Sequence, residues 1–232
     1  METRNNRDRI IEAAAALLAE GGGDAVSTRA VSAAAGVQAP AIYRIFGDKQ
    51  GLLDAVASHG FADYLRSKTA GQPTDDPVAD LRRGWDLHVG FGLANPAFYT
   101  LIYGDQRPGT EPSAAREASA VLAGMISRIA AAGRLRMSED RAAFLVHSTG
   151  RGVTLTLISQ PENTRDMSLS VLARESVIAT VTTDPPRRTQ PDGGGVVGHA
   201  VALRAALPQT TSLTDPERAL LTEWLDRIAT AD

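Results

Sequence analysis

Gln38 and Arg44 are long polar side chains in a short run of otherwise small or apolar residues. A glutamine can pair with the edge of adenine, and an arginine can pair with guanine or with a phosphate. Ala39 and Ala41 lie between them and are small enough to touch the methyl group of thymine. These residue types are able to contact the bases of a DNA duplex, but they do not define a base sequence.

Residue patterns typical of catalysis or of metal binding are missing from the sequence. There is no G-x-S-x-G, no H-E-x-x-H and no cysteine that could act as a nucleophile or a zinc ligand. The four histidines are dispersed, at positions 59, 88, 147 and 199. Residues 193–198 match G-x-G-x-x-G, but the segment before them is not the buried strand that a dinucleotide site requires. We therefore predict that the protein is not an enzyme and needs no cofactor or metal.

The composition is that of a globular protein. Hydrophobic residues make up 43% of the 232 residues and charged residues 22%, which excludes disordered, collagen-like and coiled-coil chains. A net charge of −3 excludes a protein that is basic throughout, but it allows a local basic patch. No apolar run reaches the ~18 residues of a membrane span, and the N-terminus lacks the apolar core of a secretory signal. We expect a cytoplasmic protein without a membrane partner.

The spacing of apolar residues predicts an all-α protein. Ile10, Leu17 and Leu18, for example, fall on one face of a helix that the glycines at 21–23 are expected to end. Residues 68–77 are polar and rich in Gly and Pro, and are expected to form a linker. The predicted helices cover residues 7–20, 28–35, 38–46, 49–66, 76–94, 98–103, 113–132, 139–160, 166–182, 197–207 and 214–229.

Residues 27–46 have the organisation of a helix-turn-helix. Gly36 permits a sharp turn after the first helix, and Val37 fills the angle between the two helices. The second helix is short, and it has Ile42 and Phe46 on its inner face and polar groups on its outer face. A helix of this kind enters the major groove of DNA.

The sequence from about residue 7 to residue 65 resembles the DNA-binding segment of the tetracycline-repressor (TetR/AcrR) family. The family pattern is a capped helix, an Ala-Gly-Val turn, a short helix with Tyr and Phe, and then a Lys followed by a Leu pair. These positions are Ser27, Ala35-Gly36-Val37, Tyr43, Phe46, Lys49 and Leu52-Leu53. Gln38 departs from the small hydroxyl residue that the family often has at the start of the recognition helix.

The resemblance implies two parts. Residues 1–67 would form a three-helix helix-turn-helix domain, and residues 68–232 a helical bundle that binds an effector and dimerises, with an unassigned extension at 184–232. Lys49 is expected on a DNA phosphate, because it lies in the first turn of its helix, where the helix dipole also favours an anion. The expected DNA-binding residues are Thr28, Arg29, Gln38, Ala39, Pro40, Ala41, Tyr43, Arg44 and Lys49.

The N-terminal arginines leave two possibilities open. Arg4, Arg7 and Arg9 could follow the minor groove of DNA as a disordered arm. A solvated tail is the alternative.

Aromatic residues are dense between positions 85 and 103, where the sequence is also similar to a ligand-domain subgroup of the family. This similarity implies an effector cavity with few polar groups, which suits a small and mostly apolar ligand. The alternative is that these side chains are simply core, and Arg151 could instead pair with an acid at a dimer interface. The candidate ligand-binding residues are Trp85, His88, Phe91, Tyr99, Tyr103, His147 and Arg151.

The function implied by the resemblance is regulation of transcription. A homodimer would occupy a palindromic operator with half-sites ~34–36 Å apart or a multiple of that spacing, and repress transcription. A small molecule would shift the helix at 76–94 against the helix at 49–66 and release the DNA. The alternatives are an activator, a regulator without a ligand, a DNA-binding head on a small-molecule-modifying enzyme, and an adaptor that binds a protein through residues 184–232.

The helices at 139–160 and 166–182 are expected to pair with their symmetry mates as a four-helix bundle. The extension could wrap this bundle or cover the cavity. Apolar surface for the dimer is expected from Ala142, Leu145, Val146, Val153, Leu157, Leu172 and Ile178.

Overall fold

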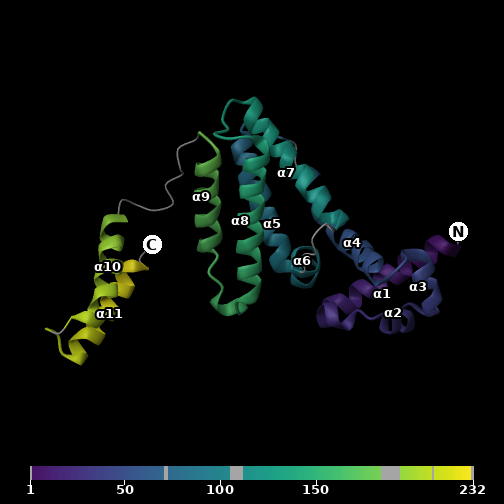
Figure 1. Cartoon of the computed structure of the whole chain (residues 1–232), viewed down its shortest axis with the longest axis horizontal. Coiled ribbons are helices and arrows are strands. Elements are labelled where there is room, and N and C mark those ends of the chain that lie inside the picture. Colours follow the sequence, from purple (N-terminus) through teal and green to yellow (C-terminus); the bar gives the residue numbers. More distant parts are fainter. Residues whose placement is uncertain (1, 71–72, 105–111, 184–193, 211, 231–232) are drawn as a thin grey trace. The chain divides into compact units, whose positions relative to one another are not determined.

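The computed structural model describes residues 2–70, 73–104, 112–183, 194–210 and 212–230, and every regular element within these ranges is a helix (Figure 1). The prediction of an all-α protein is confirmed. Residues 1–186 and residues 187–232 form two compact units. No helix in the described ranges combines the length and the apolarity that crossing a membrane demands. The predicted loops at 104–112 and 183–195 fall largely on residues 105–111 and 184–193, outside the described ranges.

The first four helices of the larger unit share one apolar core. They are α1 (Glu2–Ala25), α2 (Thr28–Ala35), α3 (Ala39–Phe46) and α4 (Lys49–Ala70). The α1 helix is interrupted at Gly22, whose φ of 66° and ψ of −166° are not helical, so the glycine triplet breaks the helix as its sequence indicates. Its members include Ile10, Leu18, Val31, Ile42 and Leu52.

The N-terminal arginines do not form a disordered arm, because α1 already includes them. The Nη2 of Arg9 donates to the backbone carbonyl of Ala35 at 2.5 Å, at the C-terminus of α2. The guanidinium of Arg7 lies 5.8 Å from the centre of the Phe46 ring. A cation is favoured both at a helix C-terminus and over an aromatic face, which explains why these side chains bind the domain itself.

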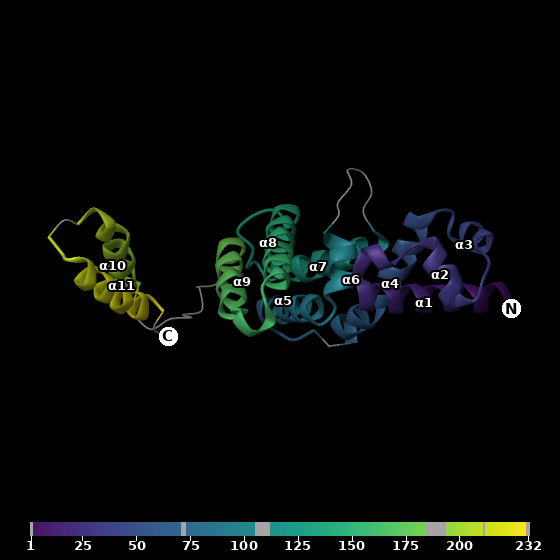
Figure 2. The same cartoon turned by 90° about the horizontal axis from the view of Figure 1, so that it is seen from below.

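The remaining helices of this unit form a bundle. They are α5 (Pro77–Ala94), α6 (Pro96–Tyr103), α7 (Ser113–Ala131), α8 (Glu139–Ser159) and α9 (Ser168–Val181). In both views α8 lies between α7 and α9 (Figures 1 and 2). Asp76 caps α5 by accepting from the N–H of Val78, as the Asp-Pro pair predicts. The core of the bundle includes Leu81, Trp85, Ile126, Ile129, Val146, Leu157 and Ile178.

A buried ion pair joins α5 to α9. The Nε of Arg82 donates to both carboxylate oxygens of Glu175 at 3.0 Å, and Arg174 donates to the same carboxylate at 2.9 Å. Burial alone would raise the pKa of Glu175, but the hydrogen bonds from Arg82 and Arg174 outweigh it and lower the pKa. The carboxylate therefore stays ionised and holds the two helices in register.

Four of the residues expected at the dimer surface point instead into the core of their own chain. Ala142, Val146, Leu157 and Ile178 are each at most 5% exposed and pack against α5 and α7 residues. Leu145 and Val153 are half-buried against the same core, and only Leu172 is exposed. The prediction that this face of α8 forms the dimer interface is therefore wrong, because α5 and α7 of the same chain cover it.

The smaller unit is a helical hairpin. It contains α10 (Gly194–Ala206) and α11 (Asp215–Ala229). The predicted capping box at the start of α11 is confirmed, since Thr214 and Glu217 bond each other's backbone N–H reciprocally. Its core is small, with Ala200, Leu207 and Leu225 buried.

Candidate DNA-binding and effector sites

The turn between α2 and α3 depends on two residues that hold its geometry. Ser27 caps α2 by accepting from the N–H of Ala30 at 3.1 Å. Gly36 ends α2 in the left-handed conformation, with φ 62° and ψ 40°. A Cβ on Gly36 would also lie 3.2 Å from the Nη2 of Arg9. Any other residue at this position would be strained by the positive φ, and its Cβ would crowd the guanidinium of Arg9.

The α3 helix is anchored by one side and exposed on the other. Ile42 is fully buried in the core, whereas the side chains of Tyr43 and Arg44 are exposed, Tyr43 by 50%. Gln38 precedes the first turn without using its side chain as a cap, so its amide remains on the surface. Pro40 is exposed in the first turn, and Ala39 and Ala41 are half-buried. The polar face that the sequence predicts is therefore presented to the outside of the domain.

Lys49 lies at the start of α4, beside the end of α3. Its side chain is exposed, and Asp48 caps the helix by accepting from the N–H of Gly51 at 2.7 Å. Gly51 packs so closely that a Cβ would lie 2.1 Å from the carbonyl oxygen of Phe46. Sequence reasoning missed this glycine, whose contact fixes Lys49 relative to α3. The N–H groups and dipole of α4 favour an anion at this position.

The start of α2 adds one cation to this surface. Arg29 is exposed and Thr28 is half-buried, both in the first turn of α2. Together with Arg44 and Lys49, Arg29 gives the surface three exposed cations on three helices. This is the local basic patch that a chain with a net negative charge needs in order to approach DNA.

A small cavity lies in the bundle, between α5, α6, α7 and α8. Its volume is about 30 Å³. Four of the candidate ligand residues, Trp85, His88, Tyr103 and His147, line it. The remaining lining is mostly apolar and includes Leu81, Ala118, Leu122, Met125 and Val146.

Polar groups near the cavity form a chain of contacts among aromatic rings. The Nε2 of His88 and the hydroxyl of Tyr99 are 2.7 Å apart, and the Nδ1 of His88 is 3.5 Å from the hydroxyl of Tyr64. Burial raises the pKa of Tyr64 and of Tyr99 above the ordinary value, so both phenols stay neutral. His88 is therefore positioned from both ring nitrogens, and Tyr64 is a contributor that sequence reasoning missed.

Three candidate ligand residues lie outside the cavity lining. Phe91 packs on Phe61, with ring centres 5.1 Å apart, and is core. Tyr99 is fully buried behind His88. Arg151 is half-buried, and its charge acts on Tyr99 in opposition to the effect of burial. Trp85 lines the cavity with its ring, while its indole N–H donates to Ser170 at 3.1 Å.

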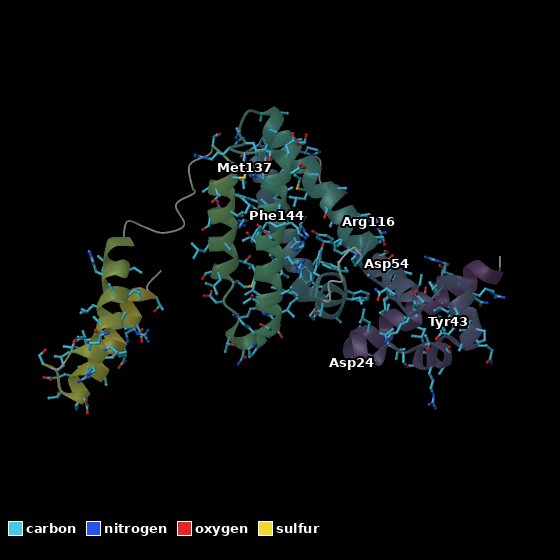
Figure 3. All side chains as sticks on the ribbon, in the orientation of Figure 1. Asp24, Tyr43, Asp54, Arg116, Met137 and Phe144 are labelled. Atoms are coloured by element: carbon cyan, nitrogen blue, oxygen red, sulfur yellow. The ribbon has the colours of Figure 1, made fainter. Side chains whose placement is uncertain are left out.

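The DNA-binding helices and the bundle are joined through α4. The carboxylate of Asp54 accepts from the backbone N–H of Ser113 at 2.9 Å and from its hydroxyl at 3.0 Å. The hydroxyl of Ser58 is 2.7 Å from that of Ser113. Because Ser113 is the first residue of α7, α4 supplies the N-terminal cap of α7 (Figure 3).

The comparisons with known proteins agree with this arrangement. Residues 10–56 match the model of the family described as bacterial regulatory proteins, tetR family. This segment therefore has the sequence of a TetR-family DNA-binding domain. The match covers α2 and α3 completely, together with most of α1 and the first part of α4. The expectation that the protein is not an enzyme agrees with this match to a family of regulatory proteins.

Curated proteins similar to this chain include HTH-type transcriptional regulators of Mycobacterium tuberculosis and Mycobacterium bovis. Each is 28% identical over 148 residues, which covers 58% of this chain and 61% of the relative. The similarity thus spans about three fifths of the relatives' length.

Solved structures of low identity share the fold. A TetR-family regulator from Pectobacterium atrosepticum has a TM-score of 0.64 and 21% identity, and the match covers 79% of this chain and 97% of that one. FadR from Bacillus subtilis, solved in complex with stearoyl-CoA, has a TM-score of 0.62 and 15% identity, with 74% and 97% covered. RolR, solved in complex with resorcinol, has a TM-score of 0.60 and 18% identity, with 78% and 89% covered.

Proposed function

We propose that this protein is a TetR-family transcriptional repressor that binds a palindromic operator as a homodimer in the cytoplasm. The observation that carries the proposal is the placement of α3, which Ile42 anchors while Gln38, Tyr43 and Arg44 face outward. An anchored helix with an exposed polar face is the element that enters a major groove. Lys49 and Arg29 beside it supply charge for the phosphates on either side.

The dimer is proposed to form through the outer face of α8 and α9. Phe144 is 70% exposed on α8, and Leu169 and Leu172 are 46% and 54% exposed on α9. Ser148, Gly152 and Thr156 continue the exposed face of α8 at intervals of four residues, and residues of this size let a partner helix approach closely. A dimer is required because one recognition helix reads too few base pairs to specify a site.

Phe144→Asp tests this interface in the full-length protein. A charge at the centre of an apolar interface should convert the dimer to a monomer in sedimentation velocity. Leu87→Asp is the matched control, because Leu87 is also an exposed apolar residue, 41% exposed on α5. A dimer that survives Phe144→Asp would place the interface elsewhere.

The effector is proposed to be a small, mostly apolar molecule that enters the cavity of the bundle. The lining is apolar apart from His88, Tyr103 and His147, which can orient a ligand. The volume of about 30 Å³ is on the scale of one or two water molecules. Binding therefore requires the helices around the cavity to separate, and α7, which contributes Ala118 and Leu122, is one of them.

A path from the cavity to the DNA-binding surface runs through α7 and α4. Displacement of α7 pulls on Asp54, which caps its first turn. Asp54 lies little more than one turn after Lys49 on α4, so the strain acts directly on the end of α3. The ligand shifts the equilibrium only by the difference between its affinities for the two states.

Selection of DNA sequences by the purified full-length protein, at a fixed salt concentration, tests the main proposal. A palindrome should be enriched, and Tyr43→Ala and Lys49→Ala should each weaken binding to it. Enrichment of no sequence, with no effect of either substitution, would refute the proposal. Release of the operator can then be used to screen organic compounds, since two solved structures of this fold were obtained with stearoyl-CoA and resorcinol.

Binding in the cavity can be followed separately from DNA release. Trp85 lines the cavity, and the chain has one other tryptophan, Trp224. In a Trp224→Phe variant, a ligand that enters the cavity should change the fluorescence of Trp85. A compound that changes this signal without changing operator affinity would indicate a regulator whose DNA binding is independent of ligand, and transcription assays would separate a repressor from an activator.

A further inference from the structure

Arg151 on α8 is a half-buried cation without a counter-ion among the residues that the structure describes. No hydrogen bond or ion pair joins its guanidinium to another of these residues. The other buried and half-buried arginines of the described ranges each bond a carboxylate or a backbone carbonyl: Arg82, Arg128, Arg134, Arg165, Arg174 and Arg218. A charge that is partly withdrawn from water is costly unless it is paired. Arg151 is therefore the exception, and it can pair with an anion that comes from outside the chain.

Arg151 lies on the side of α8 that faces α6 and α7. His147, four residues before it, lines the cavity of the bundle. Leu155, four residues after it, packs against the buried cluster that contains Tyr99 and Tyr103. Residues at this spacing follow one another along one side of a helix. Burial raises the pKa of Tyr99, and the charge of Arg151 acts in the opposite direction, so this charge reaches the buried hydroxyl groups of α6.

The cavity has a polar end at α6 and an apolar end away from it. The rings of His88 and His147 each lie 5.7 Å from the ring of Tyr103 on α6. Leu81, about two turns before His88 on α5, and Met125 on α7 line the apolar end. The described lining contains no Asp, Glu, Lys or Arg. A ligand with its apolar body between these helices therefore has its head group at the end where Arg151 lies.

The groups at the polar end favour an anionic head group with two oxygen atoms. A guanidinium can only donate hydrogen bonds, and its planar fork matches the two oxygens of a carboxylate. Tyrosine hydroxyls and histidine N–H groups can donate to the same oxygens. A cationic head group would be repelled by Arg151, whereas a neutral one would leave its charge without a counter-ion.

We propose that the effector is a small apolar carboxylic acid, bound as the carboxylate, whose head group pairs with Arg151. Arg151 lies outside the lining of the closed cavity, but the helices must separate to admit any ligand of this size. It is about one helical turn beyond His147, which does line the cavity, so the head group needs to extend only that far. The inference rests on the proposed effector site and adds a chemical class of ligand to it.

Matched acids and amides test the ligand class in the full-length Trp224→Phe protein. The pairs are benzoate with benzamide, 3-phenylpropionate with 3-phenylpropanamide, and hexanoate with hexanamide. At neutral pH the members of a pair differ mainly in the charge of the head group. Titrations follow the fluorescence of Trp85, which lines the cavity, and the heat of binding. At least one acid should bind tenfold or more tightly than its amide, because charge-assisted hydrogen bonds are the stronger ones.

Substitution of Arg151 tests whether this residue causes the preference. Arg151→Gln should raise the dissociation constant of the acid about tenfold and leave that of the amide unchanged. Arg151→Lys should keep part of the preference, because it retains the charge but loses the planar fork. Arg116→Gln, at an exposed arginine of α7, is the control and should change neither constant.

Thermal melting without ligand separates this role from a structural one. Arg174 is half-buried like Arg151, but it is paired with Glu175 and Asp86. Arg174→Gln should therefore lower the Tm. Arg151→Gln should melt at the temperature of the parent protein or above it, because no bond within the chain is lost. A fall in Tm as large as that of Arg174→Gln would overturn the proposal.

Three further outcomes would overturn the carboxylate, and they differ in what they leave in place. Equal binding of the acids and the amides would retain the effector site with a neutral ligand. A weaker dimer of Arg151→Gln in sedimentation velocity, with an unchanged preference for acids, would mean that Arg151 pairs with an acid of the partner subunit. If none of the six compounds binds, the effector site fails as well, and selection of DNA sequences still decides whether the protein binds an operator.

Discussion

Asp54 on α4 caps α7 by accepting hydrogen bonds from both the N–H and the hydroxyl of Ser113. A helix is usually capped by the residue that precedes it, but α7 follows Pro112, which provides no side-chain cap. The first turn of α7 is thus completed only when α4 is in place. This makes Asp54 a direct mechanical connection between the bundle and the helix that carries Lys49.

Asp54→Ala should weaken this connection. Loss of the cap should lower the free energy of unfolding by about 1–2 kcal/mol in denaturant titrations. It should also reduce the factor by which an effector weakens operator binding, since α7 no longer pulls on α4. Asp24→Ala, at the exposed end of α1, is the control. An unchanged effector response in Asp54→Ala would show that the coupling runs through other contacts.

Lys49→Ala should weaken DNA binding without changing the preferred sequence. A phosphate contact contributes through counterion release, so its loss should reduce the slope of log K against log salt by about 1. Binding titrations at several salt concentrations measure this slope. A change in the selected sequence, with an unchanged slope, would mean that Lys49 contacts a base.

Gln38→Ala should relax the sequence preference at one position of each half-site. A good pair between a side chain and a base discriminates by about 1–3 kcal/mol, so one conserved base pair should become variable in the selected operators. Competition with single-base variants of the operator gives the magnitude. If all base pairs keep their preference, the Gln38 amide serves only to position the helix.

Gly51→Ala should be destabilising, although the residue is only half-buried. The added Cβ would lie 2.1 Å from the carbonyl oxygen of Phe46, so α3 and α4 must separate, at a cost of about 1–3 kcal/mol. Gly23→Ala is a matched control, because a Cβ there meets nothing within 4 Å. Thermal melting of the two variants compares them. Equal stability would refute this account of the α3–α4 junction.

The bundle should become less stable at low pH, because protonation of Asp80 removes the stabilisation that its charged form provides. Burial alone would raise the pKa of Asp80, but hydrogen bonds from Thr74 and Arg128 outweigh it and lower the pKa to about 2. Because the folded pKa lies below the unfolded value of 3.8, the stabilisation is present above pH 4 and is lost as the pH falls towards 2. The loss is roughly 2 kcal/mol.

Asp80→Asn isolates this contribution from those of the other carboxylates. Its stability should differ from that of the parent protein at pH 6, and the difference should disappear towards pH 2. Urea titrations across this range measure it. A difference that does not change with pH would show that Asp80 stabilises by packing and not by its charge.

The local elements were predictable because each carries its own signals. Ser27, Gly36 and the Asp76-Pro77 pair define helix ends through caps and left-handed exits that depend on nearby residues only. The outer face of α3 could likewise be predicted from the sequence, because its apolar and polar residues alternate with helical period. These signals need no knowledge of the tertiary structure.

The contacts between helices were harder to predict from the sequence. Ala142 and Val146 have the apolar character of an interface, and only the positions of α5 and α7 show that they are internal. Asp54 and Ser113 are 59 residues apart, and neither has a sequence signal that indicates the other. Likewise Arg9 looks like a surface arginine until α2 places a carbonyl within its reach.

The small cavity sets the selectivity of the response that we propose. Part of the binding energy of an effector is used to separate the helices. Its apparent affinity is therefore its affinity for the open form multiplied by the fraction of molecules that are already open. Weakly bound hydrocarbons and solvent molecules cannot meet that cost at ordinary concentrations. A sensor that is nearly closed at rest therefore ignores a background of small apolar compounds and answers only those that fit well enough to open it.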